Sequence, residues 1–181
     1  MILWAILTDC VVTRGGWFDD TGPHWSRSNY SGPISAYDLE DTYLPPWEGA
    51  ISQGGALGIM CSYDGPNGIP SCGNQALQVG VLQKQYGLAG PIVTDCGAIP
   101  GMMCSLNYSA TPEQAVADAL HAGVAIDCGP FGGPCDNGHG LQQGGNASFG
   151  LPSTMNGAVK QGLITELGAN LTLFPLTLLR F

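Results

Sequence analysis

Three short apolar runs in the middle of the chain end on polar residues and recur at a regular interval. The runs are GALGIMCSY, GPIVTDC and VAIDCG, and they end near Tyr63, Asp95 and Asp127, with 32 residues from each end to the next. Short apolar runs bounded by turn residues are typical of strands that are buried on both faces. We therefore predict three buried strands, each followed at its carboxyl end by a polar side chain.

Helical patterns fill the intervals between these runs. NQALQVGVLQKQY lies between the first two, with Asn74 as the expected N-cap and Gly87 as its end. A loop and then TPEQAVADALHAG lie between the second and the third. In that helix Thr111 is the expected N-cap, Pro112 takes the first helical position, and Gln114 completes a capping box.

Two more helices are expected outside this central part. Residues 36–51 have apolar positions about four apart and Ser35 as N-cap, but Pro45 and Pro46 must kink or split the helix. Residues 153–164, STMNGAVKQGLI, form the other candidate.

Strand and helix alternating in this way indicate consecutive βαβ units and a parallel sheet. Two architectures use such units, a (β/α)8 barrel and an open doubly wound sheet. A full barrel needs roughly 250 residues, so a chain of 181 residues has room for about three or four of the eight units. An open sheet fits the length better, and both architectures place their ligands at the carboxyl ends of the strands.

Charge narrows the classes of partner. Only 10% of the residues are charged, five of them are Lys or Arg, and the formal net charge is −9. Nucleic acids and anionic membrane surfaces are bound through clustered cations, so the composition argues against both. The sequence has no apolar stretch of 18 residues that would span a membrane. A neutral substrate suits this composition.

The seven cysteines have no spacing typical of a metal site. Cys61 and Cys72 bracket one short loop and are the favoured disulfide. Cys96 and Cys128 follow equivalent acids on neighbouring predicted strands and could also pair. Spacing alone leaves the connectivity open.

Four N-x-S/T sequons point to the secretory pathway, where disulfides also persist. Chance would give about one in a chain with eight Asn. We therefore expect a secreted protein. The four acceptor residues are Asn29, Asn107, Asn146 and Asn170.

Asp95 is the strongest candidate for chemistry. A carboxylate at the carboxyl end of a buried strand either caps the loop that follows or is held facing a cleft to react, and the spacing leaves both open. Tyr63, one period earlier, either forms a hydrogen bond with a ligand hydroxyl through its OH or is a half-buried core residue. Asp127 is more typical of a turn cap.

Five stretches of the chain resemble the plant- and fungal-type β-xylosidases of glycoside hydrolase family 3, in the order and at about the spacing of that family. The stretches are YDLEDTYLPPWEGAI, GIMCSYDGPNGIPSC, LAGPIVTDCGAI, TPEQAVADALHAGVAIDCGPF and AVKQGLITE. The resemblance implies an α/β fold that is a partial (β/α)8 TIM-type barrel, of which this chain has only the later βα units.

The resemblance also implies roles for particular residues. Asp95, in the S/T-D-C motif, matches the catalytic nucleophile of the family, and Tyr63 and Met60, in the M-x-S-Y motif, match residues of the adjacent sugar subsite. The implied reaction is retaining hydrolysis of a small neutral sugar conjugate or xylo-oligosaccharide by two carboxyl groups. It requires no cofactor and no metal.

The resemblance predicts boundaries as well. Residues 1–33 read as an irregular segment unlike the family, and residues 34–181 as the C-terminal part of its N-terminal barrel domain. The acid/base partner of Asp95 is not identifiable in this chain. We therefore expect either a piece of a secreted exo-acting β-xylosidase or an inactive carbohydrate-binding remnant of the same fold.

Overall fold

The computed structural model describes residues 30–129 and 150–165, and at their centre lies a parallel three-stranded sheet. The strands are β1 (Ile59–Cys61), β2 (Ile92–Thr94) and β3 (Val124–Ile126), and they lie in the order β1-β2-β3. The prediction of three buried parallel strands is confirmed. The hydrogen-bonded part of each strand is shorter than its apolar run.

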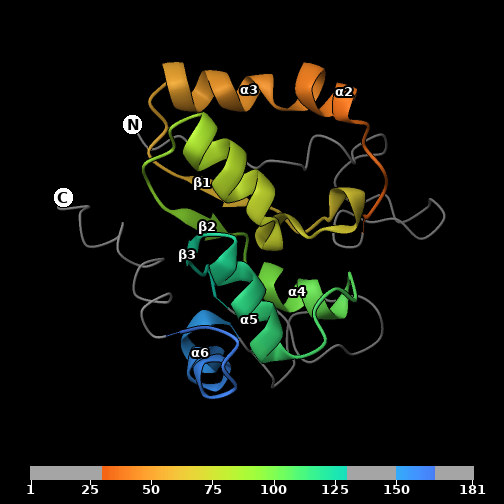
Figure 1. Cartoon of the computed structure of the whole chain (residues 1–181), viewed down its shortest axis with the longest axis vertical. Coiled ribbons are helices and arrows are strands. Elements are labelled where there is room, and N and C mark those ends of the chain that lie inside the picture. The colour runs from red at the N-terminus through yellow and green to blue at the C-terminus, as the bar shows by residue number, and fades with distance from the viewer. Residues whose placement is uncertain (1–29, 130–149, 166–181) are drawn as a thin grey trace.

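Helices precede, connect and follow the strands (Figure 1). Before β1 come α2 (Ala36–Asp38), η1 (Leu39–Tyr43), α3 (Pro45–Glu48) and η2 (Gly49–Gln53). Between β1 and β2 come η3 (Pro66–Gly68), η4 (Ser71–Gly73) and η5 (Ala76–Gln85). Between β2 and β3 come α4 (Ala98–Cys104) and α5 (Pro112–His121), and α6 (Leu151–Lys160) follows the sheet.

The expected helix ends are largely present. The Asn74 side-chain oxygen accepts from the Leu77 N–H at 3.1 Å, and Gly87 takes the left-handed conformation (φ 82°) where η5 ends. The Thr111 hydroxyl accepts from the Gln114 N–H at 3.1 Å. The predicted capping box of α5 is wrong in one respect, because the Gln114 amide donates to Asp118 at 2.8 Å and is turned along the helix.

The segment 36–51 is split, as its prolines predict. The Ser35 hydroxyl accepts from the Asp38 N–H at 3.0 Å, which confirms this N-cap. Helix η1 ends at Tyr43 and α3 begins at Pro45. Proline lacks an N–H and is tolerated in the first turn, where no intrahelical partner is needed.

One prediction of a loop is wrong. The stretch between Asp95 and Thr111 contains α4, although Pro100 and Gly101 weaken its helical pattern. All five residues from Ala98 to Met102 are buried. Burial of a short apolar segment against its neighbours overrides the unfavourable local propensity.

The helices build the core on one face of the sheet. Ile59, Ile92 and Val124 pair in register, are 0% exposed, and pack in one cluster with Leu82 of η5 and Val116 of α5. Helices η5 and α5 lie over the same side of the strands in Figure 1. This face is therefore the side on which the helices bury the sheet.

The other face carries the alternate residues of the strands. Met60, Val93 and Ile126 are aligned across the sheet by the pairing and stand outside the main core cluster. Met60 and Ile126 are half-buried. Side chains alternate along a strand, so Asp95, two positions after Val93, has its side chain on this face as well.

No helix in the described ranges is both long enough and apolar enough to span a bilayer.

Replacing Ile92 by Ala tests whether the middle strand anchors the core. Ile92 is 0% exposed, and Leu57, an aliphatic residue of the same size just before β1, is 49% exposed. We expect Ile92→Ala to lower the free energy of unfolding by roughly 2–5 kcal/mol. The matched Leu57→Ala variant should stay within about 0.5 kcal/mol of the parent chain in urea unfolding. Equal losses would contradict this account of the core.

Candidate active site

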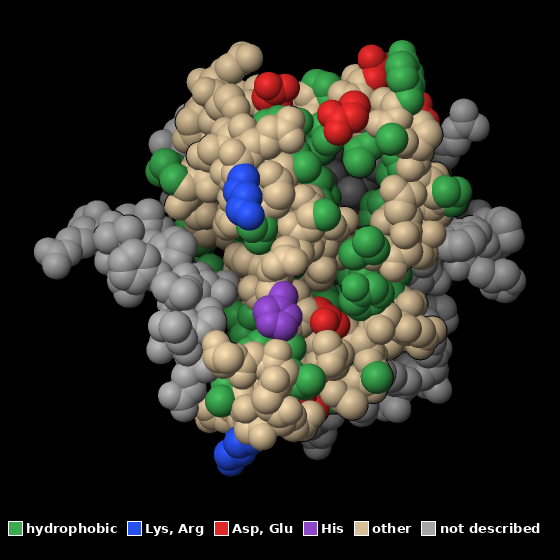
Figure 2. Space-filling view, viewed as in Figure 1, with side chains coloured by type: hydrophobic (Ala, Val, Ile, Leu, Met, Phe, Trp, Pro, Cys, Tyr) green, Lys and Arg blue, Asp and Glu red, His purple; other side chains and the backbone are tan. Residues whose placement is uncertain are grey.

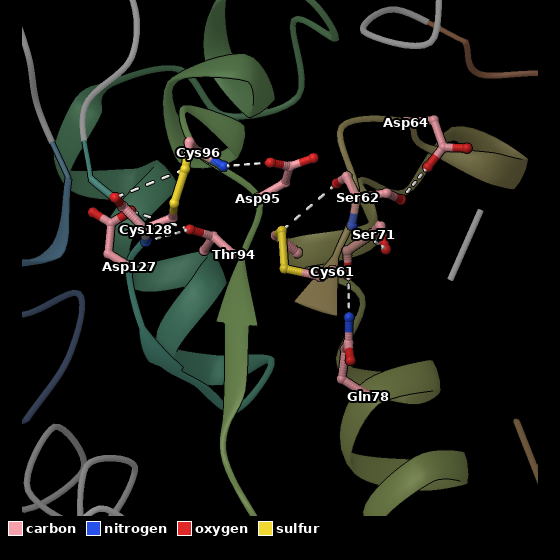
Figure 3. Close-up of a disulfide and its surroundings, with 11 residues drawn as sticks. Cys61, Ser62, Asp64, Ser71, Gln78, Thr94, Asp95, Cys96, Asp127 and Cys128 are labelled. Atoms are coloured by element: carbon pink, nitrogen blue, oxygen red, sulfur yellow. Dashed lines mark hydrogen bonds between the residues drawn. A yellow bond between two sulfur atoms is a disulfide. The ribbon is translucent and has the colours of Figure 1, made fainter. Parts of the chain in front are cut away.

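The carboxyl ends of the three strands meet at one edge of the sheet (Figure 3). Cys61 pairs with Thr94, and the N–H of Asp95 donates to the carbonyl of Cys61 at 2.9 Å, so the ladder continues one residue past β2. The loops that begin at Ser62 and Asp127 lie on either side of Asp95. This edge is where parallel α/β folds bind their ligands.

Asp95 lies at the end of the middle strand and is half-buried. Its Oδ1 accepts from the N–H of Cys96 at 2.7 Å. Its Oδ2 has no hydrogen-bond partner among the described residues. By strand alternation its side chain belongs with Val93, on the face opposite the helices. The carboxylate thus caps one N–H of its own turn and keeps one oxygen available.

The structure brings Tyr63 to the turn that follows Asp95. The phenol is 8% exposed, and its hydroxyl donates to the carbonyl of Cys96 at 3.0 Å. That bond occupies the phenolic proton. Tyr63 is therefore a core residue that contacts the turn after Asp95, and its contact with a ligand stays a prediction.

Met60 lies deeper than Tyr63 along β1. It pairs with Val93, two residues before Asp95, and it is half-buried on the face opposite the helices. This places Met60 and Asp95 on the same face by alternation. No polar group is contributed by Met60, so any contact with a ligand at this position would be apolar.

Two disulfides join the loops at this edge, and they are the two pairings that the spacing suggested. Cys61–Cys72 closes the loop after β1, with a Cα–Cα distance of 5.1 Å. Cys96–Cys128 joins the end of β2 to the end of β3, with a Cα–Cα distance of 4.6 Å. Gly97, in the left-handed conformation (φ 85°), adds a hydrogen bond from its N–H to the carbonyl of Gly129 at 3.1 Å.

The pairing of β2 with β3 contains an irregularity of one residue. Ile92 pairs with Val124 but Val93 pairs with Ile126, which leaves Ala125 without a partner on β2. An extra residue of this kind is a β-bulge, and the residues after it face the side opposite to the one that regular pairing would give.

Asp127 therefore lies beside Thr94 and not beside Asp95. The Thr94 hydroxyl donates to Asp127 Oδ1 at 3.1 Å, and the N–H groups of Gly129 and Leu151 donate to the same carboxylate at 3.1 and 3.0 Å. Asp127 thus holds its own turn and the first residue of α6. The expectation of a turn cap is confirmed.

Sequence reasoning missed two buried hydroxyl residues of this edge. Thr94, fully buried, also accepts from the N–H of Cys128 at 3.0 Å. The Ser62 hydroxyl donates to Asp64 at 2.6 Å, and both side chains are at most 2% exposed. The available signal was a small hydroxyl residue one or two places before an acid at the end of an apolar run.

A separate hollow lies between helices on the face seen in Figure 2. It measures about 240 Å³, below the usual range of small-molecule sites. Its lining is mostly apolar, with residues from η1 and η5 such as Leu39, Tyr43 and Leu77. None of Asp95, Tyr63 or Met60 lines it, and it contains no carboxylate. It does not have the chemistry of the strand edge.

Tyr86 has a shifted pKa at the opposite end of the sheet. It follows η5 and precedes β2, and it is 7% exposed. Burial raises the pKa of its phenol above the ordinary value of 10, and the charges of Glu48 and Glu40 raise it further. The shift belongs to the packing of the helical layer. In the described ranges, no group of three or more His, Cys, Asp or Glu side chains could hold a metal ion.

Comparison with known proteins identifies the family. The N-terminal domain of glycosyl hydrolase family 3 matches residues 20–129. This chain belongs to that family.

Its similar relatives include β-xylosidases of plants and fungi. The chain is 34% identical over 147 residues to beta-D-xylosidase 1 of Arabidopsis thaliana, covering 81% of this chain and 16% of the relative. It is 33% identical over 144 residues to exo-1,4-beta-xylosidase bxlB of Emericella nidulans, covering 78% of this chain and 16% of the relative. The chain thus spans about one sixth of the length of the curated relatives that it matches.

Solved structures share the fold. A family 3 exo-β-xylosidase (XlnD), in complex with a xylobiose aziridine activity-based probe, superposes with a TM-score of 0.67 at 24% identity. That match covers 83% of this chain and 17% of the other. A β-glucosidase from Listeria innocua superposes with a TM-score of 0.63 at 20% identity, covering 82% and 18% of the two chains.

The two acids of the strand edge should respond differently to neutralisation. Asp127→Asn replaces the carboxylate whose oxygens accept three hydrogen bonds. The amide nitrogen in place of one oxygen cannot accept from the Leu151 N–H. We expect this substitution to lower the free energy of unfolding by about 1–3 kcal/mol. Asp95→Asn, whose Oδ1 can still accept from Cys96, should cost less than about 0.5 kcal/mol. Urea unfolding of both variants measures the difference, and the reverse order would contradict the assignment of Asp127 as a cap.

Proposed function

We propose that Asp95 is the nucleophile of a retaining glycosidase that acts on β-xylosides or related plant-wall sugars. The observation that carries the proposal is the Asp95 carboxylate itself, half-buried at the carboxyl end of β2, with one oxygen that accepts no hydrogen bond within the described ranges. Its β-xylosidase relatives supply the substrate class.

The reaction begins with attack of an Asp95 oxygen on the anomeric carbon. The bond from that carbon to the leaving oxygen breaks, the leaving oxygen takes a proton from an acid, and a covalent glycosyl-enzyme remains. Water then releases the sugar with the second carboxyl group acting as base. In the proposal Tyr63 lies beside the sugar, where its phenolic oxygen accepts from a sugar hydroxyl, and Met60 gives apolar contact.

The acid/base is assigned to no residue of this chain. Asp127 is the neighbouring strand-end carboxylate, but its three hydrogen bonds and its place beside Thr94 oppose the role. Retaining glycosidases hold their two carboxyl groups about 5–5.5 Å apart, and we assign that place to no carboxylate of the described residues.

We also propose that the sheet is the later part of a (β/α)8 barrel, with the domain running over residues 34–181. The order β1-β2-β3 means that both crossovers move the same way across the sheet. Right-handed crossovers of this kind put their helices on one face of the sheet. In a barrel the helices likewise all lie on the outer face of the closed sheet. The remaining face, which carries Met60 and Val93, is then the barrel interior.

An inactive carbohydrate-binding remnant is the second candidate. The observation that favours it is that Asp127, the neighbouring strand-end carboxylate, accepts three hydrogen bonds and caps its turn, so that no acid/base partner of Asp95 is identified in the described ranges. A remnant would bind a xylo-oligosaccharide without forming a covalent bond.

A label that needs no acid separates the two candidates. Incubating the purified chain with 2,4-dinitrophenyl 2-deoxy-2-fluoro-β-xyloside should give one covalent fluoroxylosyl group per chain, because dinitrophenolate leaves without protonation. We expect peptide mapping to place the adduct on Asp95, Asp95→Asn to form none, and Asp127→Asn to keep it. Binding without an adduct supports the remnant, and an adduct on another carboxylate contradicts the role of Asp95.

We propose that the protein enters the secretory pathway. The disulfides and the sequon at Asn107 support this. Asn107 is exposed and takes the left-handed conformation (φ 51°), while the hydroxyl of Ser109 is buried and donates to Asp118 at 2.7 Å. A glycan on Asn107 would project into solvent, but the sequon hydroxyl is accessible only before the loop packs.

Expression as a secreted protein in yeast tests this proposal. We expect peptide mapping after endoglycosidase treatment to find a glycan remnant on Asn107. Asn107→Gln should abolish that signal without changing the secondary structure. A secreted, folded chain with an unmodified Asn107 would contradict the assignment.

A further inference from the structure

We propose that the Cys96–Cys128 disulfide is a positioning element for Asp95, and that reducing it with a dithiol switches off the reactivity of this carboxylate. The inference rests on the proposed role of Asp95 as nucleophile. It adds a control that the activity itself does not require.

The disulfide acts on Asp95 through one peptide group. Cys96 directly follows Asp95, and its N–H donates to Asp95 Oδ1 at 2.7 Å. The orientation of this peptide therefore sets where the carboxylate points. The Cys96 sulfur is bonded to Cys128 on the β3 side (Figure 3). The Cys96 carbonyl accepts from the Tyr63 hydroxyl on the β1 side. The peptide is thus held between both neighbouring strands.

After Asp95, one backbone hydrogen bond among the described residues joins this turn to the β3 side. The N–H of Gly97 donates to the carbonyl of Gly129 at 3.1 Å. Gly129 and Gly97 both have positive φ angles, and glycine has the widest range of backbone conformations. Without the covalent bond, hydrogen bonds alone would join this part of the chain to the loop after β3. They are the bond from Gly97 to Gly129 and, one residue before Asp95, the bonds of Thr94 with Asp127 and with the Cys128 N–H.

The two disulfides of the strand edge differ in access. Cys61 and Cys72 are 0% and 1% exposed, whereas Cys96 is half-buried and Cys128 is exposed. Thiol–disulfide exchange requires a thiolate to reach a sulfur atom. A mild reductant should therefore open Cys96–Cys128 while Cys61–Cys72 remains closed.

The redox step is a two-electron exchange. One thiolate of the dithiol attacks a sulfur of the Cys96–Cys128 bond and displaces the other sulfur as a thiolate, which gives a mixed disulfide. The second thiol then closes the reductant into a cyclic disulfide. The products are two protein thiols and one oxidised dithiol, with both protons supplied by the dithiol.

The test uses the full chain before and after mild treatment with dithiothreitol. Alkylation and peptide mapping identify which cysteines have been reduced. Labelling by the fluoroxyloside is then measured as a rate at saturation and a half-saturating concentration. We expect reduction to lower the saturating rate about tenfold or more, because small misplacements of a reacting group are costly. The half-saturating concentration should change little, and reoxidation should restore the rate.

Variants separate positioning from general loss of structure. The Cys96→Ala, Cys128→Ala double variant should label slowly and show no further response to dithiothreitol. Cys104 is also disulfide-bonded and lies at the end of α4, so Cys104→Ala is the matched control. It should label at the parental rate and keep the response. If the double variant fails to fold, the reduced parent chain still gives the answer.

Amide hydrogen exchange provides a readout that does not depend on activity. Reduction should raise the exchange rates of the Cys96 and Gly97 amides, whose hydrogen bonds define the turn, and leave those of residues 59–61 unchanged. Unchanged labelling and exchange after Cys96–Cys128 has opened would overturn the proposal and leave the proposed function intact. Absence of any adduct in the oxidised chain would overturn the proposed function. The exchange rates alone would then show whether the Cys96–Cys128 disulfide holds the Asp95 turn in place.

Discussion

The register between β2 and β3 is the constraint on which the rest of this edge depends. A regular ladder would align Asp95 with Asp127, since each directly follows its strand. The unpaired Ala125 shifts β3 by one residue and places Asp127 beside Thr94. The Asp127 carboxylate thereby holds the first residue of α6, and the Asp95 carboxylate lies on the opposite face, with one oxygen that accepts no hydrogen bond among the described residues.

Different kinds of bond connect the loops that follow the three strands. Tyr63 contacts the Cys96 carbonyl through a phenol, Cys128 contacts Cys96 through sulfur, and Thr94 bridges two groups of the third loop through a hydroxyl. Buried polar groups are costly unless paired, so these bonds also make the edge specific. The family match over residues 20–129 includes this edge of the sheet.

Much of the fold could be read from the sequence, because its strands are buried on both faces and so appear as uninterrupted apolar runs. The helix caps at Ser35, Asn74 and Thr111 were also predictable from the neighbouring residues. Helix α4 was not, since burial and not propensity stabilises it. The different positions and hydrogen-bond partners of Asp95 and Asp127 could not be predicted either. A repeat of 32 residues makes them equivalent, and only the pairing of strands reveals the bulge.

The bond between Asp127 and the N–H of Leu151 has a consequence for how such a protein can diversify. It fixes residues 127 and 151 next to each other, whatever chain connects them. Once two anchors are fixed, doubling the length of the connection costs only about 0.6 kcal/mol in closure entropy. The contact between Asp127 and Leu151 can therefore be kept by related proteins whose connections between these two residues differ in length.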